Sequence, residues 1–147
     1  MSVHLLDVNV LIALAWPQHV HHAPAHKWFG RTGHAAWATC PLTETAFVRI
    51  SSNLKIIPEA VSPREAVEVL RKIVSLPGHH FWGDAIPVAN APVFGSLALV
   101  GHRQVNDAYL VALVQQQGEK LATFDRGVAE LLPTPKERTR YVTIIEV

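Results

Sequence analysis

The chain has 147 residues, 49% of them hydrophobic and 17% charged, and no linker-like stretch, so one globular domain over residues 1–147 is expected. Thirteen basic and twelve acidic residues give a net charge of +1, which excludes a protein held to nucleic acid by overall charge alone. The single cysteine, Cys40, and a longest apolar run of only residues 8–16 predict a cytoplasmic protein with neither a disulfide nor a membrane anchor.

The first half of the chain alternates apolar segments of strand length with segments of helical periodicity. In chain order we expect a strand at 3–6, helices at 8–14 and 20–29, a strand at 35–39, helices at 41–50 and 63–76, and a strand at 79–82. Pro41 suits a first helical turn, and Ser62 and Glu65 have the spacing of a capping box.

The second half opens with a proline-containing connection over residues 83–101, in which a short helix is expected near residues 94–99. Beyond it we expect, in chain order, a helix at 106–117, a strand at 120–124, a short helix up to residue 132 and a strand at 141–145. Asn106 is the expected cap of the first of these helices, and Gly118 is its expected stop.

Strands that alternate with helices predict a parallel sheet, because parallel neighbours need a crossover connection of about a dozen residues or more. We expect an α/β fold, a three-layer α/β/α sandwich around a central parallel sheet of four to five strands. In such folds ligands bind outside the carboxyl ends of the strands, so polar residues that follow strands are candidate site residues.

Four acidic residues are placed to reach that edge. Asp7 and Asp125 each end an apolar strand, while Glu44 and Asp107 fall in the first turns of helices. Taken singly, Glu44 or Asp107 is better explained as favouring a helix dipole, worth roughly 0.3–1 kcal/mol. That explanation does not account for convergence at one edge, because neighbouring carboxylates repel one another unless a cation lies among them. Mg²⁺ is the expected cation, with Mn²⁺ expected to substitute, since both accept oxygen ligands.

Two polar residues, Asn9 and Thr123, each lie two positions from a strand-ending aspartate and are expected to support the acids, although either is also explained as a local cap. Arg49 and Arg126 lie near the acids in sequence, where they are suited to hold phosphate or to pair with a carboxylate.

The histidines offer a different metal site, because His22 and His26 are four residues apart on an expected helix. Zinc needs three or four firm ligands, and the sequence has neither an HExxH nor a CxxC motif. We therefore predict a solvated helix face there.

Four segments carry a resemblance to a known family: LLDVNVLIAL at 5–14, LTETAFVR at 42–49, VNDAYL at 105–110 and LATFDR at 121–126. With these segments the chain resembles a PIN-domain protein of the VapC toxin family over nearly its whole length. One such segment is a weak signal, but four in this order and spacing are specific. The segment GHRQ at 101–104 is similar to a subset of these toxins, and Asn106 replaces a threonine that is common at its position.

The resemblance implies a PIN-like fold and an endoribonuclease toxin of a type II toxin–antitoxin pair. Such toxins are usually homodimers, inhibited by a VapB-type antitoxin whose C-terminal segment lies across the active site. Mg²⁺ held chiefly by Asp7 and Asp107, with Asp125 and Glu44 as ligands or through water, is expected to lower the pKa of a water that attacks an RNA phosphodiester. Products with 3′-hydroxyl and 5′-phosphate ends are expected.

Two alternative functions remain. A strand followed by DxD also opens haloacid-dehalogenase-like phosphatases, although Asn9 stands where their general acid is expected. A non-catalytic RNA- or protein-binding PIN module keeps the fold without the reaction, and four intact acids argue against such decay.

Overall fold

The computed structural model describes residues 2–83, 86–89, 94–95 and 97–147. Its five strands form one sheet in the order β3-β2-β1-β4-β5, and every neighbouring pair is parallel. The strands are β1 (His4–Leu6), β2 (Trp37–Thr39), β3 (His79–Phe81), β4 (Lys120–Thr123) and β5 (Val142–Ile144). The predicted central parallel sheet is confirmed.

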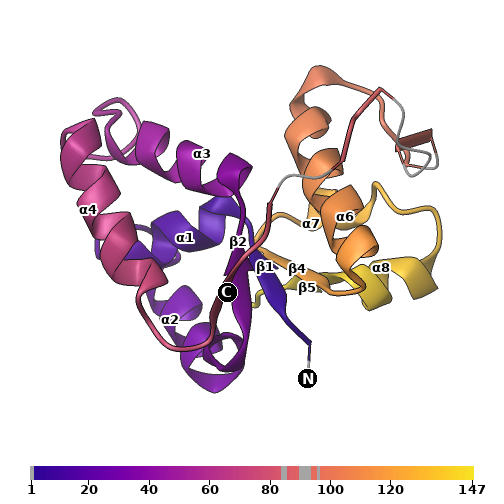
Figure 1. The fold of residues 1–147 in the computed structure, drawn as a ribbon, viewed down its shortest axis with the longest axis horizontal. Helices are drawn as coiled ribbons and strands as arrows, with labels where there is room; N and C mark the ends of the chain where they lie inside the picture. Colours follow the sequence, from indigo (N-terminus) through magenta and orange to yellow (C-terminus); the bar gives the residue numbers. More distant parts are fainter. Residues whose placement is uncertain (1, 84–85, 90–93, 96) are drawn as a thin grey trace.

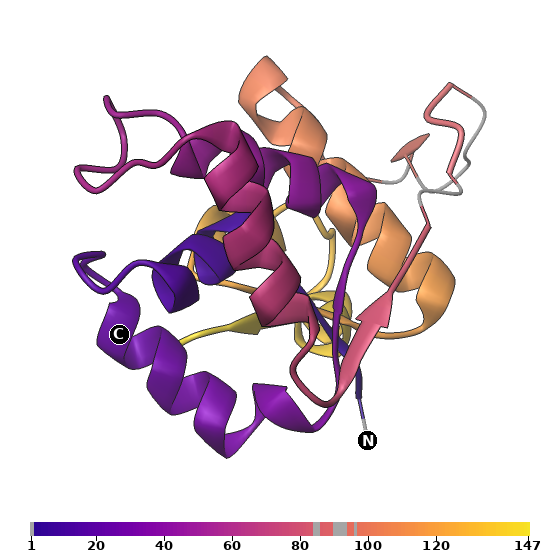
Figure 2. The same cartoon turned by 60° about the vertical axis from the view of Figure 1, so that its left-hand side comes forward.

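Helices cover both faces of this sheet, which confirms the predicted three layers (Figure 1). One face carries α1 (Val8–Ala15), α2 (His22–Arg31), α3 (Pro41–Ser51) and α4 (Pro63–Val74). The other face carries α6 (Val105–Gln117), α7 (Arg126–Ala129) and α8 (Pro135–Tyr141). In the turned view α4 is the outer element on its side and packs on α3 (Figure 2). Two 3₁₀ turns, Gly33–Ala35 and His102–Gln104, precede β2 and α6.

The hydrophobic core has two halves, one on each side of the sheet. Consecutive residues of a strand point to opposite faces, so Leu5 packs under α6 with Val111, while Leu6 packs under α1 and α3 with Phe47. All four side chains are fully buried, and each contributes on the order of 1.5–3 kcal/mol through loss of apolar surface. Burial on both sides fits the unbroken apolar strands of a parallel sheet.

Three details differ from the predictions. The helix α8 was not expected, and α6 begins at Val105, so that Asn106 lies inside the helix and is not its cap. Of the helix expected near residues 94–99, residues 94–95 are helical, residue 96 lies outside the described residues, and residues 97–100 are not helical. No helix formed by the described residues is long and apolar enough to span a membrane.

Candidate active site

Asp7 lies where β1 ends and α1 begins, and its carboxylate accepts two hydrogen bonds. Oδ1 accepts a hydrogen bond from the Val8 backbone N–H at 2.7 Å, which caps the helix, and Oδ2 accepts one from the Thr123 hydroxyl at 2.8 Å. The side chain is 5% exposed. Burial raises the pKa of Asp7, the two hydrogen bonds oppose that rise, and the charge of Asp125 adds to it.

The Thr123 hydroxyl connects Asp7 to two other predicted site residues. While it donates to Asp7, its Oγ1 accepts hydrogen bonds from the Asn9 side-chain amide and from the Asp125 backbone N–H, each at 3.1 Å. Thr123 is fully buried, so these partners fix its orientation. Thr123, itself held by Asn9, therefore fixes the orientation of the Asp7 carboxylate.

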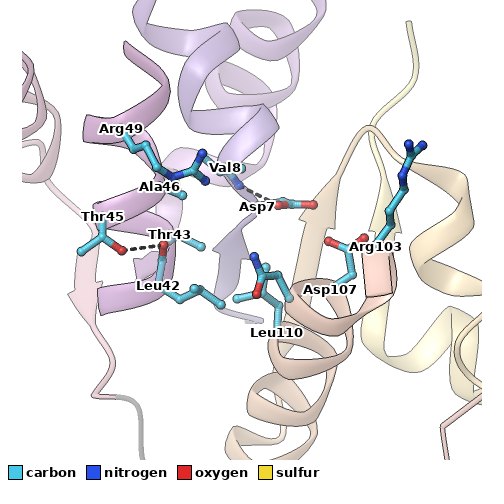
Figure 3. Close-up of a pocket in the computed structure, with 11 residues that line it drawn as sticks. Asp7, Val8, Leu42, Thr43, Thr45, Ala46, Arg49, Arg103, Asp107 and Leu110 are labelled. Atoms are coloured by element: carbon cyan, nitrogen blue, oxygen red, sulfur yellow. Dashed lines mark hydrogen bonds between the residues drawn. The ribbon is translucent and has the colours of Figure 1, made fainter. Parts of the chain in front are cut away.

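Asp107 approaches from the first turn of α6 on the other side of this edge. Its carboxylate and that of Asp7 point into the same space (Figure 3). Within the described part of the chain, no hydrogen bond or ion pair neutralises the Asp107 side chain. Burial first, and then the charges of Asp7 and Asp125, raise the pKa of Asp107 to about 7.

Asp125 follows β4 and caps α7, where its Oδ1 accepts a hydrogen bond from the Gly127 backbone N–H at 2.9 Å. Its side chain is exposed. The strands that precede Asp7 and Asp125 are neighbours, and the strand order reverses between them. The acids thus lie at the topological switch point of the sheet, where α/β folds bind ligands.

A cavity of about 420 Å³ lies between α3 and α6, and Asp7 and Asp107 are part of its lining. Two cations flank it, Arg49 from α3 and Arg103 from the turn before α6, and Arg49 extends toward Val8 (Figure 3). The rest of the lining comprises Val8, Leu42, Thr43, Thr45, Ala46, Asn106 and Leu110. This lining suits a phosphate-bearing ligand: the arginine side chains can bind the phosphate, and a metal ion can link the phosphate to the carboxylates.

Glu44, the fourth predicted acid, is not among the described residues that line this cavity. Its Oε2 instead accepts a hydrogen bond of 2.6 Å from the hydroxyl of Thr39, the last residue of β2. The structure therefore brings Asp7, Asp107 and Asp125 into one electrostatic environment, while the Glu44 carboxylate is hydrogen-bonded to Thr39. Catalytic roles for all four residues stay predictions.

The donor set fits a hard divalent cation. Mg²⁺ commonly takes one or two carboxylates together with water and substrate phosphate, and Asp7 and Asp107 offer two carboxylates that face one cavity. Among the residues described, no three His, Cys, Asp or Glu side chains converge as a complete metal cage. The raised pKa of Asp107 agrees with a group of carboxylates that a bound cation would stabilise.

His26 is exposed, as expected for a solvated helix face, and His22 is half-buried; both also connect α2 to α1. Nδ1 of His22 lies 2.7 Å from the Ala13 carbonyl oxygen, and Nε2 of His26 lies 2.8 Å from that of Leu14. A carbonyl oxygen only accepts, so each ring nitrogen carries the proton of its hydrogen bond.

Sequence reasoning missed Thr45 and Arg103 as residues of the cavity. Thr45 follows Leu42 by three positions, a helical spacing that places both on one face, and Arg103 lies in the GHRQ segment just before α6. Arg49 lines the cavity, where it is suited to hold a phosphate, which is one of its two predicted roles. Arg126 pairs with a carboxylate, because its Nη2 lies 3.6 Å from Oε2 of the exposed Glu146.

These features define a doubly wound α/β domain with an acidic, arginine-flanked cavity at its switch point. Residues 4–131 match the PIN domain family. The chain is 45% identical to Ribonuclease VapC39 of Mycobacterium tuberculosis over 126 residues, 86% of this chain and 91% of that protein. It is 43% identical to Ribonuclease VapC38 of the same organism over 142 residues, 96% of this chain and 99% of that protein. The chain therefore belongs to the PIN-domain family, and within it to the VapC group.

Two solved structures share the fold at low sequence identity. Mycobacterium tuberculosis VapC20, described as a sarcin-ricin loop cleaving toxin, superposes with a TM-score of 0.63 at 15% identity, covering 90% of this chain and 100% of its own. VapBC2 from Rickettsia felis, bound to a DNA fragment from its promoter, gives a TM-score of 0.63 at 8% identity, covering 98% and 99%.

Proposed function

We propose that this protein is an endoribonuclease that depends on a divalent metal ion, Mg²⁺ with Mn²⁺ as a substitute, and that it is the toxin of a type II toxin–antitoxin pair. Relatives named ribonuclease, 40–45% identical over most of the chain, support the activity. The observation that supports the metal dependence is the pair Asp7 and Asp107, which face one cavity and form no ion pair with any described residue.

Each residue of the site has a proposed task. Asp7 and Asp107 hold the ion, and Asp125 and Glu44 act as further ligands or through water. Thr123 and Asn9 fix the orientation of Asp7 through their hydrogen bonds. A bound divalent ion would acidify the attacking water and act as a Lewis acid toward the scissile phosphodiester.

The flanking cations supply the means to hold the substrate. Arg49 and Arg103 lie on two sides of the cavity, where their guanidinium groups are suited to bind RNA phosphates next to the cleaved bond. Local cations are needed, because the net charge of +1 gives little general attraction for nucleic acid.

The proposed partners follow from the VapC group. A VapB-type antitoxin is the expected inhibitor, and one structural neighbour is a VapBC pair bound to promoter DNA. A homodimer and a cytoplasmic location complete the proposal. Membership of the PIN-domain family leaves the phosphatase alternative without support, and the Asn9 side-chain amide donates to Thr123 where that alternative needs an acid.

The test uses Asp7→Asn and Asp107→Asn, purified from their antitoxin complexes, with the exposed Glu130→Gln as a charge-matched control. Asparagine keeps the size of each side chain and, at position 7, the ability to cap α1. We expect both variants to lose Mg²⁺-dependent RNA cleavage by roughly a hundredfold or more, because a group aimed at the reacting charge is removed.

Circular dichroism is expected to show folded protein in both variants. Full cleavage by either variant contradicts the proposed site. A wild-type protein that binds RNA and never cleaves it supports the non-catalytic module instead.

A further inference from the structure

A second cavity, of about 260 Å³, lies between α2 and the end of β5. Helix α2 contributes Lys27, Trp28 and Arg31 to its lining. The other wall is formed by residues 144–146, where the end of β5 reaches α2 (Figure 2). We call this cavity the α2 pocket. The described residues that line it and those that line the candidate active site have no member in common.

The basic residues of the α2 pocket share one face of α2. Lys27 and Arg31 are four residues apart, and Trp28 and Arg31 are three apart, spacings that bring side chains together on a helix. His26 and Phe29 line a different hollow, between α2, α1 and α4. Lys27 and Arg31 therefore lie on a different face from the residues that meet α1 and α4.

Both cations of the pocket are exposed and available to a ligand. Neither the Lys27 nor the Arg31 side chain forms a hydrogen bond or ion pair with another described residue. Glu146, the one acid among the described residues of the lining, is paired with Arg126, whose Nη2 lies 3.6 Å from its Oε2. The pocket therefore presents a net positive charge, which suits a phosphate group.

The Trp28 indole is held from two sides. The ring of His4 meets it edge to face, with centroids 5.2 Å apart, and Gly33 lies so close that a Cβ there would be 2.5 Å from Cζ3 of the indole. The Trp28 side chain is half-buried, so a fixed aromatic surface lines the pocket beside the two cations. Proteins bind the bases and phosphates of single-stranded nucleic acid with this combination of aromatic and basic side chains.

The α2 pocket lies at the same edge of the sheet as the candidate active site. Ile144 is the register partner of Thr123, so the end of β5 is level with the acids. Two strand spacings, about 10 Å, separate β5 from β1. Between them Phe124, the chain neighbour of Asp125, stacks on His21 at the start of α2, with ring centroids 4.8 Å apart. A strand of RNA bound at the acids can therefore continue along this edge to the pocket.

We infer that the α2 pocket is a second RNA-binding site, which takes an unpaired nucleotide of the substrate away from the cleaved bond: its base stacks on Trp28, and its phosphates bind Lys27 and Arg31. The inference rests on the proposed ribonuclease function, because RNA is taken as the substrate. The pocket adds affinity for long RNA and takes no part in the reaction. A protein with a net charge of +1 gains local attraction for its substrate in this way.

RNA binding in the absence of cleavage tests the two cations. The probe is a series of single-stranded RNAs of mixed sequence, from about three to about twelve nucleotides long, followed by fluorescence anisotropy in the presence of a chelator. We expect the affinity of the wild type to rise once the RNA is long enough to reach the pocket.

The variant Lys27→Gln/Arg31→Gln is expected to lose that rise, about tenfold for the longest RNA. The slope of log affinity against log salt concentration is expected to become shallower by about 1.4, the effect of two phosphate contacts on a single strand. The matched control is Arg64→Gln/Lys72→Gln, which removes one arginine and one lysine from exposed positions on α4 and is expected to bind like the wild type.

Two variants of Trp28 separate base stacking from charge. Trp28→Leu removes the aromatic ring and is expected to weaken binding of the longest RNA about fivefold or more, whereas Trp28→Phe keeps a ring and stays within about threefold of the wild type. Glu146→Gln removes the acid of the pocket and is expected to tighten binding. Urea unfolding of every variant separates a change in the folded fraction from a change in affinity.

Cleavage assays supply an independent measurement. With Mg²⁺ present, Lys27→Gln/Arg31→Gln and Trp28→Leu are expected to raise the KM for long RNA and to leave kcat unchanged, because neither change touches the acids. A lower kcat at an unchanged KM contradicts a site that only binds.

The possible failures are distinguishable. If Lys27→Gln/Arg31→Gln binds long RNA as tightly as the control pair, the inference is overturned. If it loses affinity while a folded Trp28→Leu does not, the surface attracts any polyanion, such as an acidic segment of a protein partner, and a nucleotide site is likewise overturned. Full cleavage by Asp107→Asn refutes the proposed active site, whereas length-dependent binding, measured without cleavage, still supports the α2 pocket.

Discussion

Replacing Asp107 with asparagine is expected to stabilise the metal-free protein at neutral pH. The ordinary pKa of an aspartate is 3.8, and burial together with neighbouring charges raises that of Asp107 to about 7. Between these two values the unfolded chain has lost its proton while the folded chain retains it, so the free energy of unfolding falls as pH rises. Asparagine does not ionise, so the variant escapes this loss.

The size of the effect follows from the shift. One pKa unit corresponds to about 1.36 kcal/mol, so a rise from 3.8 to about 7 is worth about 4 kcal/mol at most. We expect roughly 2 kcal/mol, because the Asp107 side chain is only partly buried and salt screens its neighbours. The proposed divalent ion at Asp7 and Asp107 would offset the negative charge of these acids, so Mg²⁺ is expected to stabilise the wild type and to have little effect on the variant.

Urea unfolding in the presence of a chelator measures this difference at about pH 5 and at about pH 7.5, with Glu130→Gln as the control. Relative to Asp107→Asn, the wild type is expected to lose stability between the two conditions; the comparison cancels the titration of the histidines, which is common to both proteins. Equal changes in the two proteins, or a variant less stable than the wild type at the higher pH, refute the proposed effect of the Asp107 charge.

Substitutions at three further positions probe the scaffold of the protein. Thr123→Val removes the hydroxyl that donates to the buried Asp7 and is expected to lower the free energy of unfolding in urea by about 1.5–3 kcal/mol, whereas Thr123→Ser recovers most of it; equal losses in the two variants contradict this role. Gly118 has φ +70° and open space for a Cβ, so Gly118→Ala is expected to cost about 1–2 kcal/mol in thermal unfolding. Gly78→Ala is expected to cost distinctly more, because at φ +87° its Cβ collides with the His34 carbonyl oxygen, and equal costs mean that the backbone yields there.

Helix starts show where sequence patterns succeed and where they fail. The capping box of Ser62 and Glu65 predicted the start of α4, and both of its hydrogen bonds are present. Thr134 and Glu137 offer the same signal before α8, where the Thr134 hydroxyl oxygen accepts from the Glu137 backbone N–H. This helix was missed because it has seven residues and none of them is buried, so it leaves no apolar periodicity to detect.

By itself, the sequence determined most of the helices and strands, α8 excepted, and which residue types stand at the ends of the strands. Apolar runs that stop at Asp7 and Asp125 are local features, since a strand of a two-sided sheet must be apolar along its length and polar where it leaves the core.

Only the tertiary structure decided which of these acids share a site. The strand order places β4 beside β1, a choice made by packing between distant segments. Asp107 and Glu44 look equivalent in sequence, each in the first turn of a helix after Asn106 or Thr43. The rotation of each helix against the sheet directs Asp107 into the cavity and Glu44 toward Thr39. That rotation depends on how all the buried faces pack together, so no local pattern contains it.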